Sequence, residues 1–259
     1  MPEGPSKQTR SVVLVTGASG GIGRATACRF AEAGWLVAVH YATNAKGAQE
    51  TAAACRELGG ETVVLQGDLI DRESCEKLAA ATLDRTGRLD SLINLAGTTR
   101  FVPLKDLGGL EEADFDRIFR TNLYGPYYLS SACAEALRAA PKGSIVNCAS
   151  SSAFSGQGSS AAYSASKGAL VTMTKSLAVA LAPSVRVNAV CPDFTDTPWI
   201  SRRMDAEEHR RFCEKAAEGT LLKRMVQADD VGDANFWLAT GAQAITGETI
   251  LIDCGAALS

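Results

Sequence analysis

Short runs of aliphatic and β-branched residues alternate along the chain with longer segments in which apolar residues recur at helical spacing. The apolar runs cover residues 12–15, 36–39, 62–65, 89–93, 144–148, 185–190 and 249–252. The segments with helical spacing cover residues 22–33, 45–58, 72–86, 110–140, 162–182 and 229–238. This alternation predicts an α/β domain: one doubly wound parallel sheet of about seven strands, with helices on both faces and right-handed crossovers.

The hydrophobic pattern predicts a single domain over residues 11–259, preceded by a flexible leader over residues 1–10. Residues 192–222 interrupt the pattern with a polar and charged stretch, far longer than the usual connection of about 2–6 residues. Two interpretations of this stretch are equally good: a lid over a substrate site, or a surface helix with a solvated face.

Composition narrows the possible functions. A net charge of −3 gives no reason to expect nucleic acid or a membrane as partner, and no apolar stretch reaches 18 residues. The first ten residues do not resemble a signal peptide, so we expect a cytoplasmic protein. Eight widely spaced cysteines without a Cys-x-x-Cys pair, and only two histidines, predict free thiols and no metal site.

The first predicted strand is followed by a glycine-rich loop, Thr16 to Arg24, and then by a helix. Gly17, Gly21 and Gly23 have the spacing G-x-x-x-G-x-G. Glycines at this place let the backbone approach a pyrophosphate, which then lies against the amides of the helix N-terminus. A simple tight turn is the alternative, but the position between strand and helix favours the phosphate loop.

Tyr163 and Lys167 lie four residues apart in the predicted helix 162–182, so their side chains share one face. A cation near a phenol lowers the phenol pKa and suits it to general acid/base catalysis. With five tyrosines and nine lysines in 259 residues, this pattern arises by chance roughly one time in six. The pair therefore needs support from its neighbours.

That support comes from several motifs in a fixed order. They are the glycine loop, Asp68, Asn94-Leu95-Ala96-Gly97, Asn122, Ser150 thirteen residues before Tyr163, and Ile245-Thr246-Gly247-Glu248-Thr249. Together with Tyr163-x-x-x-Lys167 they resemble the short-chain dehydrogenase/reductase family, in particular the single-domain, Rossmann-like type that includes 3-oxoacyl carrier-protein reductases. The resemblance extends over residues 11–257.

The resemblance implies a hydride transfer between a nicotinamide cofactor and a carbonyl or secondary alcohol. Tyr163 would be the general acid/base, and Lys167 would lower its pKa and hold the nicotinamide ribose. Ser150 would hydrogen-bond the substrate oxygen, and Asn122 would anchor a water that connects Lys167 to solvent. The alternatives are turn chemistry for Ser150, which lies in a serine-rich loop, and an ordinary polar position inside a helix for Asn122.

The resemblance also implies a set of cofactor contacts. Besides Tyr163 and Lys167, these are Gly17, Ser19, Gly20, Gly21, Ile22, Gly23, Tyr41, Ala42, Thr43, Asp68, Leu69, Asn94, Ala96, Gly97, Pro192, Asp193, Thr195 and Thr197. Asp68 would accept from the adenine amino group, with a helix cap as the alternative. No carboxylate follows the second strand before Glu50, which favours NADP over NAD, although Gly20 stands where many NADP-dependent relatives have arginine.

Three residues depart from the family pattern: Leu95, Asp193 and Cys254. Asp193 replaces the usual glycine after the sixth strand and would bring a carboxylate close to the nicotinamide. We expect this charge to favour the cationic, oxidised ring.

The sequence thus favours an NADP-dependent carbonyl reductase acting on a small molecule, with Phe101, Phe154, Phe194 and Trp199 as candidate lining residues. Each of these aromatic side chains could instead belong to the core. An NAD-dependent alcohol or sugar dehydrogenase and a dinucleotide-binding sensor with little turnover are the alternatives. The apolar segments 123–137 and 169–182 exceed what one sheet face needs, and the resemblance implies that these helices pair copies of the chain into a homodimer or homotetramer.

Overall fold

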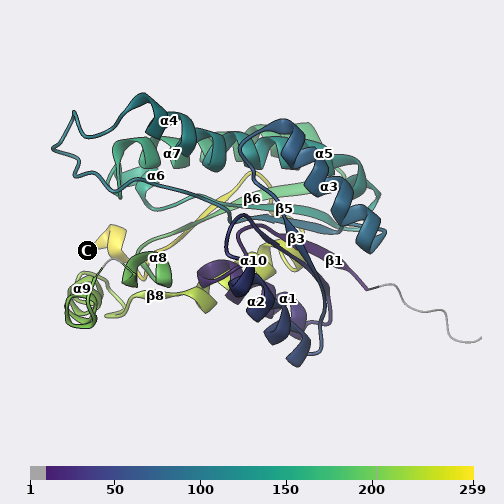
Figure 1. Ribbon diagram of the computed structural model, residues 1–259, viewed down its shortest axis with the longest axis horizontal. Coiled ribbons are helices and arrows are strands. Elements are labelled where there is room, and N and C mark those ends of the chain that lie inside the picture. Colours follow the sequence, from purple (N-terminus) through teal and green to yellow (C-terminus); the bar gives the residue numbers. More distant parts are fainter. Residues whose placement is uncertain (1–9, 203) are drawn as a thin grey trace, which may run out of the picture.

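The computed structural model describes residues 10–202 and 204–259, and a seven-stranded parallel sheet forms its centre (Figure 1). The predicted fold class is therefore confirmed. The strands are β1 (Val12–Val15), β2 (Leu36–Tyr41), β3 (Glu61–Gln66), β4 (Ser91–Asn94), β5 (Gly143–Cys148), β6 (Val185–Pro192) and β9 (Thr249–Ile252). Their order in the sheet is β3-β2-β1-β4-β5-β6-β9. Because the chain reverses direction across the sheet between β1 and β4, a crevice opens at the carboxyl ends of these two strands.

Helices cover both faces of the sheet (Figure 1). One layer contains α1 (Gly21–Glu32), α2 (Ala45–Glu57) and α10 (Ala228–Thr240). The other contains α3 (Arg72–Thr86), α4 (Glu112–Phe119), α5 (Gly125–Ala139) and α7 (Ala161–Leu181), with the short α6 (Ser152–Ser155) before α7. Strand β1 supplies both layers, since Val12 and Leu14 pack into one core cluster while Val13 and Val15 pack into the other. Burial on both faces explains why this strand is a continuous apolar run.

The single helix predicted over residues 110–140 is wrong in detail, because a π-helical turn, Arg120–Tyr124, separates α4 from α5. Pro126 explains the interruption, since proline has no N–H for the regular bond to the carbonyl of Asn122. The Gly125 N–H donates to the Arg120 carbonyl, five residues back. Such π turns are frequent at functional sites, and this one contains Asn122.

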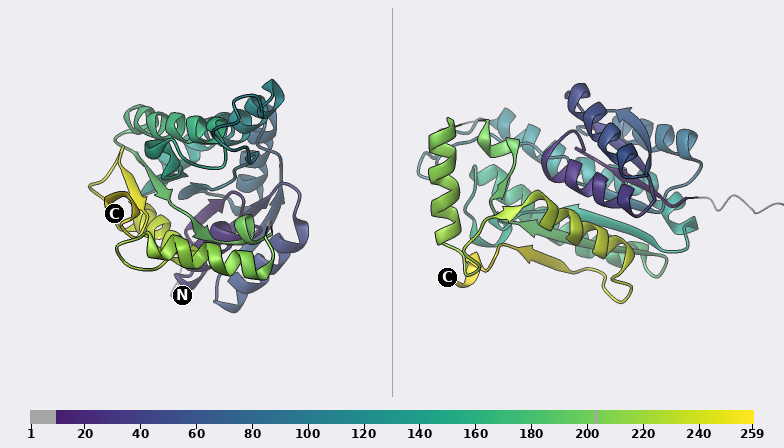
Figure 2. Two further views of the ribbon diagram at one scale, coloured as in Figure 1. Left: turned by 90° about the vertical axis from the view of Figure 1, so that its left-hand side faces the viewer. Right: turned by 90° about the horizontal axis from the view of Figure 1, so that it is seen from below.

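Residues 192–222, which we call the outer segment, contain β7 (Thr195–Asp196), α8 (Pro198–Ser201) and α9 (Ala206–Glu218). Strand β7 pairs with β8 (Val226–Gln227) in a separate small sheet. Helix α9 lies at one end of the molecule, beside the C-terminal turn rather than over the sheet (Figure 2), and it contains no buried residue. An exposed helix is thus present in this stretch, and the lid function stays a prediction.

The eight cysteines are free, as the sequence predicts. No helix among the described residues is long and apolar enough to cross a membrane. Apart from Arg10, the predicted leader lies outside the described residues.

Candidate active site

The glycine loop brings the backbone of β1 close to that of β4. Gly17 has a φ of +66°, and a Cβ atom built there would lie 2.9 Å from Cα of Ala96. A Cβ atom at Gly23 would lie only 2.3 Å from the Gly17 carbonyl oxygen. Helix α1 begins at Gly21, and its N-cap Gly20 makes no side-chain cap hydrogen bond. The close-packed loop and a helix N-terminus with no side-chain cap fit the pyrophosphate of a dinucleotide.

A buried histidine supports this loop from below. His40 Nδ1 accepts from the Gly17 N–H at 3.2 Å, and its Nε2 lies 3.1 Å from the Gly67 carbonyl oxygen. These partners require the neutral ring with the proton on Nε2. Burial lowers the pKa of His40 to about 4, which keeps the ring neutral near pH 7. Sequence reasoning missed this role, because it depends on two backbone groups distant from position 40.

Thr16 was missed in the same way. Its Oγ1 accepts from the backbone N–H groups of Leu95 and Ala96, each at 3.0 Å. It also contacts the Ile93 carbonyl oxygen at 3.4 Å. One hydroxyl therefore fixes the loop after β4 to the end of β1, where the two halves of the crevice meet.

At the end of β2, two of the predicted cofactor contacts keep an exposed surface. Ala42 and Thr43 are exposed, while the Asn44 side chain caps α2 and also donates to the Ser19 carbonyl oxygen at 3.3 Å. The amide of Asn44 is thus occupied, which leaves the Thr43 hydroxyl and the ammonium of Lys46 as donors. The Lys46 side chain is 89% exposed.

Asp68 is exposed, and it does not cap α3. The N-cap of α3 is Asp71, whose Oδ1 accepts from the Ser74 N–H at 2.8 Å. The alternative explanation of Asp68 as a helix cap is therefore wrong. Its neighbour Leu69 is buried, so only backbone atoms of Leu69 are candidates for cofactor contact.

Asn94, one of the predicted cofactor contacts, has a buried side chain. It donates to Asn147 Oδ1 at 2.9 Å, and Asn147 in turn donates to Thr174 Oγ1 at 3.0 Å. We call Asn94, Asn147 and Thr174 the buried polar chain; it joins β4, β5 and α7 inside the core. Any contact between Asn94 and a dinucleotide would therefore use its backbone.

Lys167 and Asn122 converge beneath Gly97. A Cβ atom at Gly97 would lie 3.4 Å from Asn122 Oδ1 and 3.8 Å from Lys167 Nζ. The Lys167 ammonium donates to the Cys148 carbonyl oxygen at 2.6 Å, and its nitrogen lies 5.6 Å from the centroid of the Tyr163 ring. The helical spacing therefore brings the lysine to the tyrosine, as predicted.

Asn122 is fully buried and its amide is held on both sides. Its Oδ1 accepts from the Thr98 N–H at 2.8 Å, and its Nδ2 donates to the Thr98 carbonyl oxygen at 3.0 Å and to Ser166 Oγ at 3.1 Å. The residue thus locks the loop after β4 against α7. The prediction that Asn122 anchors a water stays a prediction.

Burial raises the pKa of Tyr163, the nearby Cys148 thiol adds to the increase, and a hydrogen bond with the Ser150 side chain opposes it. This direction is opposite to the predicted lowering by Lys167. The Lys167 ammonium bonds the Cys148 carbonyl, and burial lowers its own pKa. Tyr163 is therefore a protonated phenol near pH 7, in contact with Ser150.

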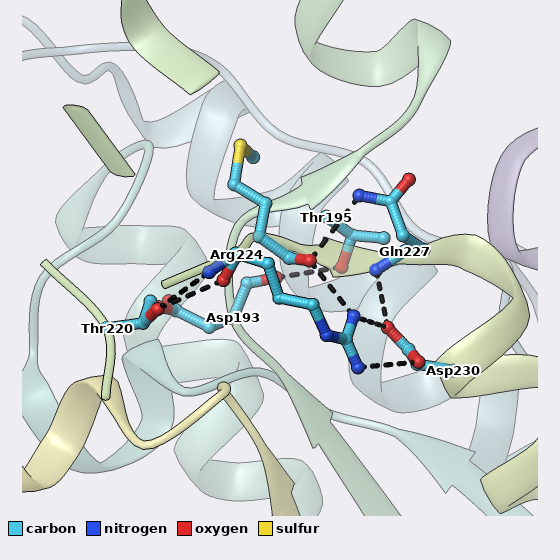
Figure 3. A network of polar contacts seen from close by, with 7 residues as sticks. Asp193, Thr195, Thr220, Arg224, Gln227 and Asp230 are labelled. Carbon is cyan, nitrogen blue, oxygen red and sulfur yellow. Dashed lines mark hydrogen bonds and ion pairs between the residues drawn. The ribbon is translucent and has the colours of Figure 1, made fainter. Parts of the chain in front are cut away.

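Asp193 lies next to this group. Its Oδ1 accepts from the Ser151 hydroxyl at 2.7 Å, and its N–H donates to the Ile252 carbonyl oxygen at 2.9 Å. Its carbonyl accepts from the Thr195 hydroxyl at 2.9 Å, as Figure 3 shows. The carboxylate is thus held by Ser151, the residue after Ser150, and its place beside a nicotinamide stays a prediction.

The outer segment reaches the glycine loop through Thr197. A Cβ atom at Gly21 would lie 3.3 Å from Thr197 Cβ. On its other side, Thr220 of the segment accepts from the Arg224 N–H at 3.2 Å, and Arg224 forms two hydrogen bonds of 2.5 and 3.0 Å to Asp230 of α10 (Figure 3). Pro192, Thr195 and Thr197 therefore lie along one path from β6 to the phosphate loop.

The four candidate lining aromatics are all exposed: Phe101, Phe154, Phe194 and Trp199, at 44%, 60%, 51% and 44%. The alternative that they form core is wrong. Phe194 packs edge-to-face with Phe212 of α9, with ring centroids 5.3 Å apart.

Known proteins share this fold and sequence. A family model described as Enoyl-(Acyl carrier protein) reductase matches residues 17–257. An uncharacterized oxidoreductase of Thermotoga maritima is 35% identical over 94% of this chain and 96% of its own length. A 3-oxoacyl-[acyl-carrier-protein] reductase of Synechocystis is 34% identical over 95% of this chain and 97% of its own. A crystal structure from Burkholderia xenovorans, described as a short-chain dehydrogenase/reductase, has a TM-score of 0.89 at 35% identity and covers 98% of this chain and 100% of its own.

The chain belongs to the short-chain dehydrogenase/reductase family. It is an oxidoreductase for carbonyl or alcohol substrates, and its family uses a nicotinamide dinucleotide.

Proposed function

We propose that the chain is an NADP-dependent carbonyl reductase in which Tyr163 protonates the oxygen of the substrate. The observation that supports this proposal best is the position of Tyr163, in contact with Ser150 and with Lys167 Nζ 5.6 Å from its ring centroid. A phenol in this position can protonate the alkoxide that develops during reduction, and the same group would accept the proton of an alcohol during oxidation. Rates measured in both directions decide which reaction predominates.

The glycine loop at Gly17, Gly21 and Gly23 would hold the dinucleotide, which would supply the hydride when bound. Ser150 would donate a hydrogen bond to the substrate oxygen and stabilise the charge that develops there. After the proton leaves Tyr163, the buried Lys167 ammonium would stabilise the tyrosinate. Asn122 would hold the loop after β4 so that Lys167 keeps this position.

The preference for NADP rests on the end of β2. No carboxylate follows this strand before Glu50, and the exposed hydroxyl of Thr43 and the exposed ammonium of Lys46, which lies 3.8 Å from Glu50 Oε1, could contact a 2′-phosphate. Titration with both reduced cofactors tests this preference, which fails if NADH binds more tightly than NADPH.

For the substrate, we propose a small to medium oxo compound, with 3-oxoacyl thioesters as the first class to test. The Synechocystis relative named as a 3-oxoacyl-[acyl-carrier-protein] reductase supports this choice. The exposed aromatics Phe194 and Trp199 would line the pocket, and the outer segment would form its lid.

We also propose that α5 and α7 pair two or four copies of the chain. The exposed Tyr124 and Tyr127 line a cavity of about 530 Å³ between these helices, together with Met173. Sizing chromatography in dilute solution tests this assembly.

The decisive experiment measures the decrease in NADPH and NADH absorbance with a panel of ketones and 3-oxoacyl thioesters, for the wild type and Tyr163→Phe. We expect NADPH-dependent reduction in the wild type and almost none in the variant. The matched control Tyr127→Phe removes a hydroxyl from α5 and should keep the activity. Alcohol oxidation with NAD as the main activity would instead identify a dehydrogenase, and tight NADPH binding without any turnover would identify a sensor.

A further inference from the structure

Outside the active site, the outer segment brings together three side chains with different ligand atoms. Asp196 ends β7, and His209 and Cys213 are one turn apart on the same face of α9. The carboxylate oxygen, the ring nitrogen and the sulfur all lie within 4.8 Å of one another. Thirteen residues of sequence separate Asp196 from His209, so the fold and not the local sequence assembles this group.

Both close contacts in this group use the same atom. His209 Nε2 lies 3.1 Å from Asp196 Oδ1 and 3.5 Å from Cys213 Sγ. To bond the carboxylate, the nitrogen must carry a proton, whereas to accept from the thiol it must present a lone pair. One protonation state of His209 can therefore make one of these two hydrogen bonds well but not both. A cation placed between the three atoms satisfies all of them.

We propose that Asp196, His209 and Cys213 bind a Zn²⁺ ion. Zinc is bound at about 2.3 Å from sulfur and about 2.0–2.2 Å from nitrogen or oxygen, in tetrahedral geometry. These bond lengths give edges of about 3.6 Å between nitrogen and sulfur and about 3.4 Å between nitrogen and oxygen. The separation of 3.5 Å between nitrogen and sulfur matches its edge, and that of 3.1 Å between nitrogen and oxygen is about 0.3 Å shorter than its edge. The oxygen and the sulfur lie within 4.8 Å of each other, so small side-chain movements bring all three atoms onto one ion.

The ligand set selects the metal. A thiolate and an imidazole favour zinc over Mg²⁺ and Ca²⁺, which prefer oxygen ligands. The Cys213 thiolate and the Asp196 carboxylate together balance the two positive charges of the ion, and His209 binds as the neutral ring. The thiol proton goes to solvent when the metal binds. Three protein ligands leave the fourth position to water.

The surroundings allow an ion to enter and give it a structural task. The Asp196 side chain is 39% exposed and that of His209 is 23% exposed. Helix α9 contains no buried residue, and its Phe212 packs against Phe194, the residue before β7. A zinc ion would link α9 to β7, next to Thr195 and Thr197. This site revises the expectation of no metal, and it does not depend on the proposed reaction.

The test uses the full chain without a histidine tag, freed of metal by a chelator. Zinc binding is measured by competition with a chromophoric chelator, and we expect one ion per chain. Loss of a residue that only hydrogen-bonds a metal ligand typically lowers zinc affinity by about 10–100-fold. Loss of a ligand itself should cost more, so Cys213→Ser and His209→Gln should each weaken zinc binding by at least about 100-fold. Hydrogen exchange of α9 should become slower when zinc is added to the wild type.

Cys28→Ser is the matched control, because Cys28 is also a half-buried free cysteine and lies on α1. It should leave zinc affinity unchanged. Co²⁺ bound in place of zinc should show a thiolate-to-cobalt charge-transfer band in the wild type and in Cys28→Ser but not in Cys213→Ser. Asp196→Asn, with its folding checked by circular dichroism, replaces any variant that does not fold. Zinc binding that is absent, that survives Cys213→Ser, or that is lost in Cys28→Ser would overturn the proposal.

Discussion

The buried polar chain and the outer segment position polar groups by opposite means. Asn94, Asn147 and Thr174 are enclosed by the core, and hydrogen bonds between their side chains fix their geometry, while Asn94 Oδ1 has no partner among the described residues. In the outer segment the contacts are exposed, as between Arg210 and Glu214 of α9. Exposed ion pairs contribute about 0–1 kcal/mol and define geometry weakly. The comparison teaches that buried polar residues, Asn122 and Lys167 of the active site among them, are preorganised, whereas the outer segment is held by exposed contacts to which the proposed zinc ion would add a link.

The largest expected effect is at Tyr163, on the preorganised side. Tyr163→Phe removes the proton donor, and general acid catalysis contributes about 10²–10⁴-fold, so kcat should fall by that factor. Because the ring remains, the thermal unfolding midpoint should stay unchanged, and dinucleotide affinity should change far less than kcat. Tyr127→Phe is the control in the same kinetic and binding assays. Activity retained in Tyr163→Phe would show that Tyr163 is not the proton donor. The preorganised residues around it would then have no demonstrated role in catalysis.

The second prediction concerns His40, which is buried under the glycine loop. Its pKa is about 4 in the folded chain and 6.5 as the ordinary value. Between these values the unfolded chain binds more protons, so the free energy of unfolding falls as pH falls from about 7 to about 4. The total loss from this group should be about 3 kcal/mol.

Urea unfolding of the wild type and His40→Gln across this pH range measures the effect as the difference between their pH slopes. A wild type and His40→Gln with parallel pH profiles would show that His40 is not held neutral by burial.

Third, Gly23→Ala tests how closely the phosphate loop is packed. The new Cβ would lie 2.3 Å from the Gly17 carbonyl oxygen, and such overpacking costs about 1–3 kcal/mol. Dinucleotide affinity should fall by about 5- to 150-fold as the loop shifts. Gly219→Ala is the matched control, since its Cβ would meet nothing closer than 3.5 Å. Equal affinities of the two variants, measured by fluorescence titration, would mean that the loop tolerates movement.

The contrast between buried and exposed regions also explains which parts of the structure could be predicted from the sequence. The strands of the sheet were predictable because burial on both faces leaves continuous apolar runs, as in Val12–Val15. Tyr163 and Lys167 were predictable because helical spacing places them on one face. The π turn was not, since the helical pattern of residues 110–140 continues through it and only Pro126 indicates a break.

The outer segment was the least predictable part. Strands β7 and β8 have two residues each, too short for any periodicity. The roles of Thr16 and His40 depend on backbone groups that only the fold brings near. The spacing of His209 and Cys213 indicates that they share one face of a helix. The position of Asp196 beside them could not be predicted, because it depends on where β7 ends.

The smallest effect is expected at Asp193, where the two regions meet. Its carboxylate is held by Ser151 and is half-buried, so its interaction with a cationic nicotinamide is screened and should contribute about 1 kcal/mol. Asp193→Gly should therefore shift the ratio of NADP⁺ to NADPH affinity by about fivefold toward the reduced form. Asp193→Asn separates charge from geometry, since an amide oxygen can still accept from Ser151. The same shift in both variants would assign the effect to charge, a shift in Asp193→Gly alone would assign it to the Ser151 contact, and an unchanged ratio in both would show that Asp193 does not tune the cofactor.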